Sequence, residues 1–343
     1  MQVRRPPRWV LAVVVAALTV AALDLVLLVA TRHDARPAEA RAAGTDHVVV
    51  VDPRTHGVVG SVPVGRLPTV VVSGYGSVWV LNRGDGTVSR IDGRSRRLLA
   101  TYQTDATVND VAVGAGGVWL AGRPRGGTQR PLEIADLERI DPRTGAIDRR
   151  FENATGAAVL AVGGGALWST GYLGGHIRGA ARSDARTGRM QPVDIGIYGD
   201  LVAADDTAAY WVASIGNRVA RVSTRTLRLT ASLPLATDAS LAAGVVPPNP
   251  TDVTLGGGAV WISTSGGTVV RVDRRLHGVV SSVPVCHNAL ALTYGLGAVW
   301  VACGEQTVVR LDPATGEPGT PIPVDGLPRS IAVGDGAVWV AVG

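Results

Sequence analysis

Lysine is absent from this chain of 343 residues, phenylalanine occurs once and cysteine twice. All 33 basic residues are therefore arginine, a bias typical of a GC-rich, actinobacterial-type genome. Three catalytic signatures are also missing: Gly-x-Ser-x-Gly, His-Glu-x-x-His and a cysteine pair at zinc spacing. No long helical period is present, which argues against a helical fold.

The charge balance argues against a nucleic-acid partner. The first 45 residues hold six arginines and three acidic residues, which leaves 27 arginines and 25 acidic residues for the rest of the chain. Nucleic-acid-binding domains concentrate basic charge to neutralise phosphates. We therefore expect no such partner.

One phrase recurs along the chain. It reads VAVGAGGVWLAG at residues 111–122 and IAVGDGAVWVAVG at residues 331–343, with apolar alternation on both sides of a glycine-rich turn. This pattern predicts a β-hairpin. Seven of the eight tryptophans lie in such a phrase, 39 to 50 residues apart: Trp79, Trp119, Trp168, Trp211, Trp261, Trp300 and Trp339.

Each repeat has the content of a propeller blade. Two more strand-like runs follow each of the first six hairpins, so a repeat holds four strands. The seventh hairpin ends the chain, and its missing pair is found in HVVVVDPRTHGVVGSVPV, residues 47–64. We therefore predict an all-β, seven-bladed β-propeller in which strands from the two ends of the propeller share one blade. Closure of the ring leaves only short, protected edges.

The segment before the repeats predicts a membrane anchor. Residues 9–30 form an apolar run of 22 with the single charge Asp24, which is long enough to span a bilayer. We divide the chain into a basic tail (1–8), a transmembrane anchor or uncleaved signal (9–30), an Ala/Pro-rich flexible linker (31–45) and the propeller (46–343). A cleaved signal peptide using residues 10–23 is the alternative. Three arginines on each side of the run leave its orientation undecided.

The two cysteines predict the compartment. If ALALT and AVWVA pair across the YGLG turn of the sixth blade, facing residues have numbers that add to 589–591, and Cys286 and Cys303 add to 589. We therefore predict a disulfide, which requires an oxidising environment. This places the propeller on the extracytoplasmic side of the cell membrane. The alternative is two buried free thiols.

Residues that recur in every blade receive a structural interpretation first. Gly-x-Gly, as in residues 334–336, supplies the positive φ angles of a tight turn. The tryptophans are expected to pack between blades, with ligand stacking as the alternative. An Arg-x-Asp ladder predicts a turn in which Asp accepts backbone N–H groups and Arg forms a surface ion pair; its members are Arg90 and Asp92, Arg139 and Asp141, Arg182 and Asp184, Arg271 and Asp273, and Arg310 and Asp312.

Two stretches carry a family resemblance. VWVLNRGDGTVSRIDGRSRRLLATYQT (78–104) and VVVVDPRTHGVVGSVPVGRLPTVVVSG (48–74) resemble the YVTN-type repeat of YncE-like β-propellers, and the resemblance covers about residues 46–343. It implies an extracytoplasmic binding or scaffolding module. Propellers host many functions, so it implies no particular activity.

The repeats are also distantly similar to streptogramin B (virginiamycin B) lyase propellers. That resemblance implies a Mg²⁺-dependent opening of a cyclic depsipeptide by a His and a Glu. The matching positions, ten or eleven residues before each repeated Trp and three after it, contain neither residue in any blade. A carbon-oxygen lyase that uses His287 and Glu305 with Mg²⁺ is therefore the alternative hypothesis.

Our leading hypothesis is a monomeric, membrane-tethered propeller that binds an unknown protein, peptide or cell-envelope ligand without catalysis or cofactor. Ligands of propellers usually meet the face where the loops leading into the innermost strands converge. By repeat position this predicts ligand-binding residues Arg66, Asn82, Arg83, Asp110, Asp200, Asp252 and Arg329, with His287 and Glu305 nearby. Insertions at 123–137 and 236–250 are either specificity loops or tolerated inserts.

Overall fold

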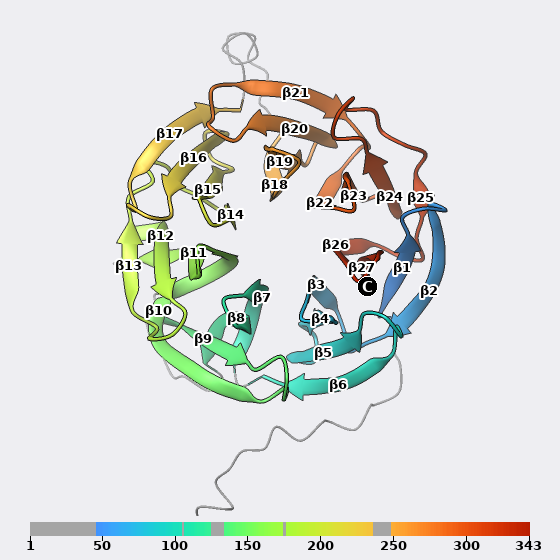
Figure 1. Ribbon diagram of the computed structural model, residues 1–343, viewed down its shortest axis with the longest axis horizontal. Coiled ribbons are helices and arrows are strands. Elements are labelled where there is room, and N and C mark those ends of the chain that lie inside the picture. Colours follow the sequence, from blue (N-terminus) through green and yellow to red (C-terminus); the bar gives the residue numbers. More distant parts are fainter. Residues whose placement is uncertain (1–45, 105, 125–133, 174–175, 236–247) are drawn as a thin grey trace, which may run out of the picture. The chain divides into compact units, whose positions relative to one another are not determined.

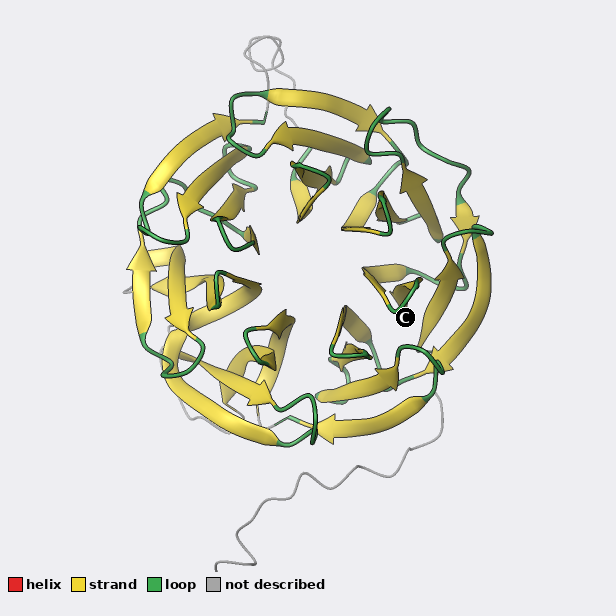
Figure 2. Cartoon of the chain, in the orientation of Figure 1, coloured by secondary structure: helices red, strands yellow, loops and turns green. Residues whose placement is uncertain are grey.

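The predicted propeller is confirmed by the structure, a computed structural model that describes residues 46–343 except 105, 125–133, 174–175 and 236–247. The described part of the chain contains strands and no α-helix. The strands form seven antiparallel blades around a central axis (Figures 1 and 2). The expected anchor at 9–30 and linker at 31–45 lie outside the described residues. Within the described ranges, no helix is long and apolar enough to cross a membrane.

The first three blades follow the chain from the innermost strand outward. Blade 1 consists of β3 (Pro68–Gly74), β4 (Ser77–Asn82), β5 (Thr87–Asp92) and β6 (Leu98–Gln103). Blades 2 and 3 consist of β7 (Ala106–Gly114), β8 (Gly117–Pro124), β9 (Ile134–Ile140), β10 (Ile147–Gly163), β11 (Ala166–Leu173), β12 (His176–Asp184) and β13 (Met190–Val193).

The next three blades repeat this order. Blade 4 consists of β14 (Leu201–Ala204), β15 (Ala208–Ala213), β16 (Arg218–Ser223) and β17 (Leu229–Pro234). Blade 5 consists of β18 (Pro250–Gly256), β19 (Ala259–Thr264), β20 (Thr268–Asp273) and β21 (Val279–Pro284). Blade 6 consists of β22 (Ala289–Gly295), β23 (Ala298–Cys303), β24 (Thr307–Leu311) and the two-residue β25 (Ile322–Pro323).

Blade 7 closes the ring in the predicted way. Its inner hairpin is β26 (Pro328–Gly334) and β27 (Ala337–Val342), and its outer pair is β1 (His47–Asp52) and β2 (Gly57–Pro63). β1 pairs antiparallel with β27, so that Val48 lies opposite Ala341 and Val50 opposite Trp339. Strands from opposite ends of the propeller sequence therefore hold one sheet together.

Blades 2 and 3 share a strand, which the repeat pattern did not predict. The first half of β10 pairs with β9 and completes blade 2, whereas its second half pairs with β11 and begins blade 3. The chain thus passes from the rim of one blade to the centre of the next without a loop, as the long green strand in Figure 1 shows. The insertion predicted at 123–137 is partly strand, since β8 extends to Pro124 and β9 begins at Ile134.

The two glycines of the hairpin phrase have different tasks. The turn has positive φ at the middle residue and at the second glycine, for example 52° at Leu296 and 73° at Gly297. The first glycine is required for close packing instead, because a Cβ on Gly295 would lie 2.5 Å from Cγ1 of Val333 in the next blade. The prediction that both glycines serve the turn was therefore only half right.

The repeated tryptophans are buried between blades, as predicted. All seven are at most 1 % exposed, and Trp300 of blade 6 packs among Val338 and Val340 of blade 7. In six of the seven phrases the indole N–H donates to the carbonyl of the first hairpin glycine five residues earlier, at 2.8–3.3 Å. The same glycine thus admits the neighbouring blade and anchors the ring that fills the gap.

Blade 4 departs from this pattern, and the alignment of Trp211 with the other tryptophans was wrong. Tyr210 lies opposite Arg221, as Trp79 lies opposite Arg90, so Tyr210 occupies the repeated position. Trp211 points to the other face of β15 and meets Trp168 edge-on, with ring centroids 5.8 Å apart. The misalignment arose because this repeat has Asp-Asp-Thr (205–207) in place of Gly-x-Gly, so the glycines could not be used to align it.

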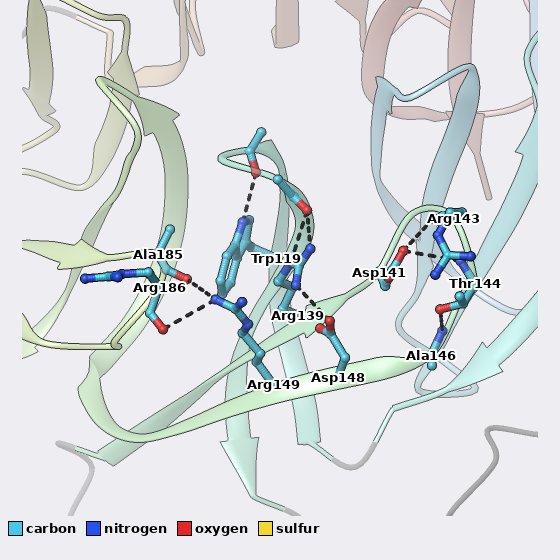
Figure 3. A network of polar contacts seen from close by, with 12 residues as sticks. Trp119, Arg139, Asp141, Arg143, Thr144, Ala146, Asp148, Arg149, Ala185 and Arg186 are labelled. Atoms are coloured by element: carbon cyan, nitrogen blue, oxygen red, sulfur yellow. Dashed lines mark hydrogen bonds and ion pairs between the residues drawn. The ribbon is translucent and has the colours of Figure 1, made fainter.

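The Arg-x-Asp ladder is also divided between two tasks. Each Asp accepts backbone N–H groups of the following turn, as Asp141 does from Arg143 at 2.7 Å (Figure 3). These bonds lower the pKa of Asp92, Asp141, Asp184 and Asp312, and equivalent bonds lower that of Asp52, which has Val50 in place of the Arg. In blades 1 and 5 the Arg lies over the tryptophan of its own blade, with guanidinium carbons 5.0 and 5.2 Å from the ring centroids of Trp79 and Trp261. The predicted surface ion pair is present at Arg139, which pairs with Asp148 at 2.7 Å and not with the turn aspartate. The predicted Asx-turn is present, and Arg90 and Arg271 each add a cation-π contact worth about 0.5–1 kcal/mol.

Candidate functional site

The segments that lead into the innermost strands meet on one face of the ring, called here the front face. It comprises the connections between blades (for example 64–67, 285–288 and 324–327) and the loops between second and third strands (83–86 and 304–306). Each loop is held to the adjacent connection by backbone hydrogen bonds, such as Arg83 N–H to the Leu67 carbonyl at 2.9 Å and Gly304 N–H to the Asn288 carbonyl at 2.8 Å. The opposite, back face carries the hairpin turns and the Asx-turns.

Three predicted arginines lie on the front face near the junction of blades 7 and 1. The side chains of Arg66, Arg83 and Arg329 are exposed. Two aspartates fix the backbone around them: Asp85 accepts the N–H of Arg66 at 2.7 Å, and Asp46 accepts that of Leu67 at 3.1 Å. Arg329 donates through Nε to the Gly343 carbonyl at 3.0 Å. The guanidinium groups are thus presented from a rigid base.

Asp110 and Asp252 occupy equivalent positions on the innermost strands β7 and β18. Asp110 accepts the N–H of Leu160 in the next blade at 2.7 Å, and Asp252 accepts that of Leu292 in its next blade at 3.0 Å. In blade 7 the hydroxyl of Ser330 does the same for Val71 at 3.1 Å. An innermost strand is the edge strand of its blade, so no strand of that blade bonds the backbone N–H groups on its inner edge. These side chains accept such N–H groups and so join neighbouring innermost strands.

Burial perturbs both carboxyls, although both residues remain half-buried on their innermost strands. Burial raises the pKa of Asp110 to about 7, against the hydrogen bonds from Leu160 and Val111, and the charge of Asp252 raises it further. Burial likewise raises the pKa of Asp252 to about 6. These two predicted ligand residues thus link neighbouring blades, and burial raises the pKa of their carboxyls.

Two other predicted ligand residues serve the fold. Asn82 is 0 % exposed and its amide donates to Thr87 at 3.0 Å and to Ser89 at 2.8 Å, so it lies inside blade 1 and not on the exposed front surface. When blade 4 is aligned on Tyr210, the residue equivalent to Asp110 and Asp252 is Leu201. Asp200 lies one position before it. Its carboxylate accepts the N–H of Ser214 at 2.8 Å and also the hydroxyl of that serine.

The structure brings His287 and Glu305 together at the front of blade 6. Nδ1 of His287 lies 2.6 Å from Oε1 of Glu305, and the same oxygen accepts the backbone N–H of His287. Burial opposes ionisation of Glu305, but these hydrogen bonds outweigh it and lower its pKa. The His287 side chain is 95 % exposed. The pair is a surface contact with an ionised carboxylate.

Cys286 and Cys303 form a disulfide beside this pair, with their Cα atoms 6.2 Å apart. The strand register behind the prediction differs, since Cys303 lies opposite Ala289 and Cys286 precedes β22. The bond closes a separation of 17 residues and is worth about 3 kcal/mol by loop length. Among the described residues, one group of three has possible metal-ligand atoms close to one another: Cys286, Cys303 and Glu305. Because the two sulfurs are bonded to each other, neither is a thiolate, and the carboxylate of Glu305 is the one metal ligand that this group offers.

A cavity on blade 7 escaped the sequence prediction. It has a volume of about 520 Å³ and is lined by His47, Ser61 and Pro63 of the outer strands, by Val342 and Gly343, and by Asp325 and Gly326 of the connection from blade 6. Comparison of the third and fourth strands between blades could have pointed to His47, since the equivalent residues are Thr87, Thr268 and Thr307.

The comparisons with known proteins leave the family open. No protein-family model matches the chain, and no curated protein matches it with significance.

The raised pKa of Asp110 makes stability depend on pH. The folded state favours the protonated carboxyl, so the stabilisation is complete below the unfolded pKa of 3.8 and is lost as pH rises toward about 7. Asp110→Asn removes this ionisation. Wild type should lose stability from this group between pH 5 and pH 8, whereas the variant should not. The unfolding free energy of the variant minus that of wild type should therefore rise by on the order of 2 kcal/mol from pH 5 to pH 8.

Asp312→Asn is the matched control, because the lowered pKa of Asp312 keeps it ionised throughout that range. Its difference from wild type should be the same at both pH values in denaturant titrations. A pH-independent difference for Asp110→Asn would show that burial does not control this carboxyl.

Proposed function

We propose that this chain is a non-catalytic, membrane-tethered binding propeller of the YVTN type, which takes a polar protein, peptide or cell-envelope ligand on its front face. The YVTN-type relationship is supported by the phrase that runs from β1 through the Val-Gly-x-x-Pro of residues 64–68. The membrane tether is supported by the apolar run 9–30.

The observation that carries the proposal is the division between repeated and unrepeated residues. The repeated Trp, Gly and turn Asp are accounted for by packing between blades and by turns. The exposed arginines of the front face, Arg66, Arg83 and Arg329, are not repeated from blade to blade, so the needs of the repeat do not account for them. Arginines on a rigid base suit acidic or carbonyl groups of a ligand, which they bind by charge-assisted hydrogen bonds.

The lyase alternative has less support. It depends on His287 and Glu305, which do lie in contact. A general base works best with a pKa near the operating pH, whereas the pKa of Glu305 is lowered. The pair is also open to solvent, while catalysis of this kind benefits from exclusion of water.

The disulfide supports an extracytoplasmic location. Both cysteines of the chain are in this bond, and such bonds persist in oxidising compartments. The bond also fixes the connection into blade 6 on the proposed binding face.

The binding face can be tested by photocrosslinking in the native host. A photoreactive residue in place of Arg83 should give a discrete crosslinked product, whereas one in place of Arg143 on the back face should not. The product should fall by about tenfold when Arg66 and Arg329 are changed to alanine, because two charge-assisted contacts are lost.

Alanine at Arg94 and Arg186, exposed in back-face turns, is the matched control for the loss of two charges. It should leave the Arg83 product unchanged. Equal products from both crosslinker positions, or none from Arg83 in a folded protein, would contradict the proposed face.

The location can be tested by thiol labelling of intact cells with a membrane-impermeant maleimide. We expect no labelling before treatment with an impermeant reductant and labelling afterwards, mainly at Cys286, because Cys303 is fully buried. Cys286→Ser should abolish most of the signal. Labelling that requires cell lysis would place the propeller in the cytoplasm.

A further inference from the structure

The cavity on blade 7 continues the packing between blades 6 and 7 to the front face. Val49 and Val342 belong to the same buried cluster as Ile322 and Val324 of blade 6. His47 shares a face of β1 with Val49, because side chains alternate along a strand, and Ser61 lies opposite Val49 on β2. Val342 thus joins the cavity to this buried cluster, and the rest of the lining includes the polar residues His47, Ser61 and Asp325.

Part of the polar lining is explained by the repeat and part is not. The equivalents of Ser61 in blades 4 and 5 are Ser232 and Ser282. Asp325, by contrast, corresponds to Gly65 before blade 1 and to Cys286 before blade 6, each the second residue after the repeated Pro at the end of a fourth strand (Pro63, Pro284 and Pro323). Asp325 and His47 thus differ from the residues at the equivalent positions of other blades.

A second carboxylate stands close to the cavity. A Cβ on Gly343, one of the lining residues, would lie 2.5 Å from Oδ1 of Asp46. Oδ2 of the same aspartate accepts the Leu67 N–H at 3.1 Å, which fixes its position. None of the described lining residues is an arginine, although Nε of Arg329 donates to the carbonyl of the lining residue Gly343 at 3.0 Å. The lining itself therefore offers the carboxylate of Asp325, the imidazole of His47 and the hydroxyl of Ser61 beside the aliphatic Pro63 and Val342, with the carboxylate of Asp46 close by.

We propose that this cavity binds an aliphatic primary ammonium group, as in a lysine-type side chain of a peptide ligand. The ammonium would bond to the carboxylate of Asp325 and the hydroxyl of Ser61, while its methylene stem would lie against Pro63 and Val342. The volume of about 520 Å³ lies within the range of small-ligand pockets. This inference rests on the proposed binding function and names the ligand chemistry at one part of the front face.

The test uses the full chain, purified in detergent, and two blocked amino acids as probes. Nα-acetyl-lysine methylamide carries the ammonium, and Nα-acetyl-norleucine methylamide has the same aliphatic stem without it. Titration followed by ligand-observed NMR should show saturable binding of the lysine probe and at least about tenfold weaker binding of the norleucine probe. Equal binding of the two probes, or no binding of either, would overturn the proposal.

Three variants locate the binding. Asp325→Asn should weaken binding of the lysine probe by about tenfold, because the negative charge that pairs with the ammonium is lost. Ser61→Leu should fill the cavity and abolish binding, whereas Ser282→Leu, the equivalent change in blade 5, should leave it unchanged. Both serines are exposed or partly exposed on outermost strands, so the protein should fold in each case. Binding that survives Ser61→Leu would refute the site.

Failure of this proposal and failure of the proposed function give different results. If the lysine probe does not bind but crosslinking from position 83 still depends on Arg66 and Arg329, the cavity is not a site and the front face is. If crosslinking fails as well, the binding role itself is wrong.

Discussion

The approach of neighbouring innermost strands sets the geometry of the whole ring. At the first glycine of a hairpin phrase the next blade comes so close that Gly295 has no room for a Cβ beside Val333. Away from the centre the blades diverge, and a tryptophan anchored to that same glycine carbonyl fills the widening gap. The spacing at the centre and the size of the ring farther out are therefore fixed by two residues five positions apart. Blade 4 meets the same constraint with Tyr210, whose hydroxyl donates to the carbonyl of Arg274 in blade 5.

Closure by β1 on β27 determines where variation is possible. With seven blades joined, the back face is occupied by turns whose glycine and aspartate are dictated by backbone geometry. The front face carries connections of differing sequence, and there the arginines, the disulfide and the cavity occur. The carboxyls of Asp110 and Asp252 lie between these two regions and link the inner strands through hydrogen bonds that a proton can alter. A ligand on the front face would thus rest on an inner ring that is linked by two carboxyls whose pKa burial raises.

The fold could be predicted from the sequence because its determinants repeat. Seven hairpins, a displaced outer pair and two cysteines near one hairpin were enough for the blade number, the closure and the disulfide. The register was less accessible: without its glycine, blade 4 concealed that Tyr210 replaces the tryptophan, and Asp200 was misaligned by one residue. The site was hardest, because burial decides it. Asn82 faces inward, and the cavity depends on His47 and Asp325, which are 278 positions apart in the sequence and meet only when blade 7 closes.

The most direct test of this account is the stability of Gly295→Ala against Gly60→Ala in denaturant titrations. Both glycines lie in strands without positive φ, but a Cβ at Gly60 would meet no atom within 4 Å. We predict that Gly295→Ala lowers the unfolding free energy by about 1–3 kcal/mol through overpacking against Val333. Gly60→Ala should change it by less than about 0.5 kcal/mol. Equal stabilities of the two variants would contradict the claim that contact between innermost strands governs the ring.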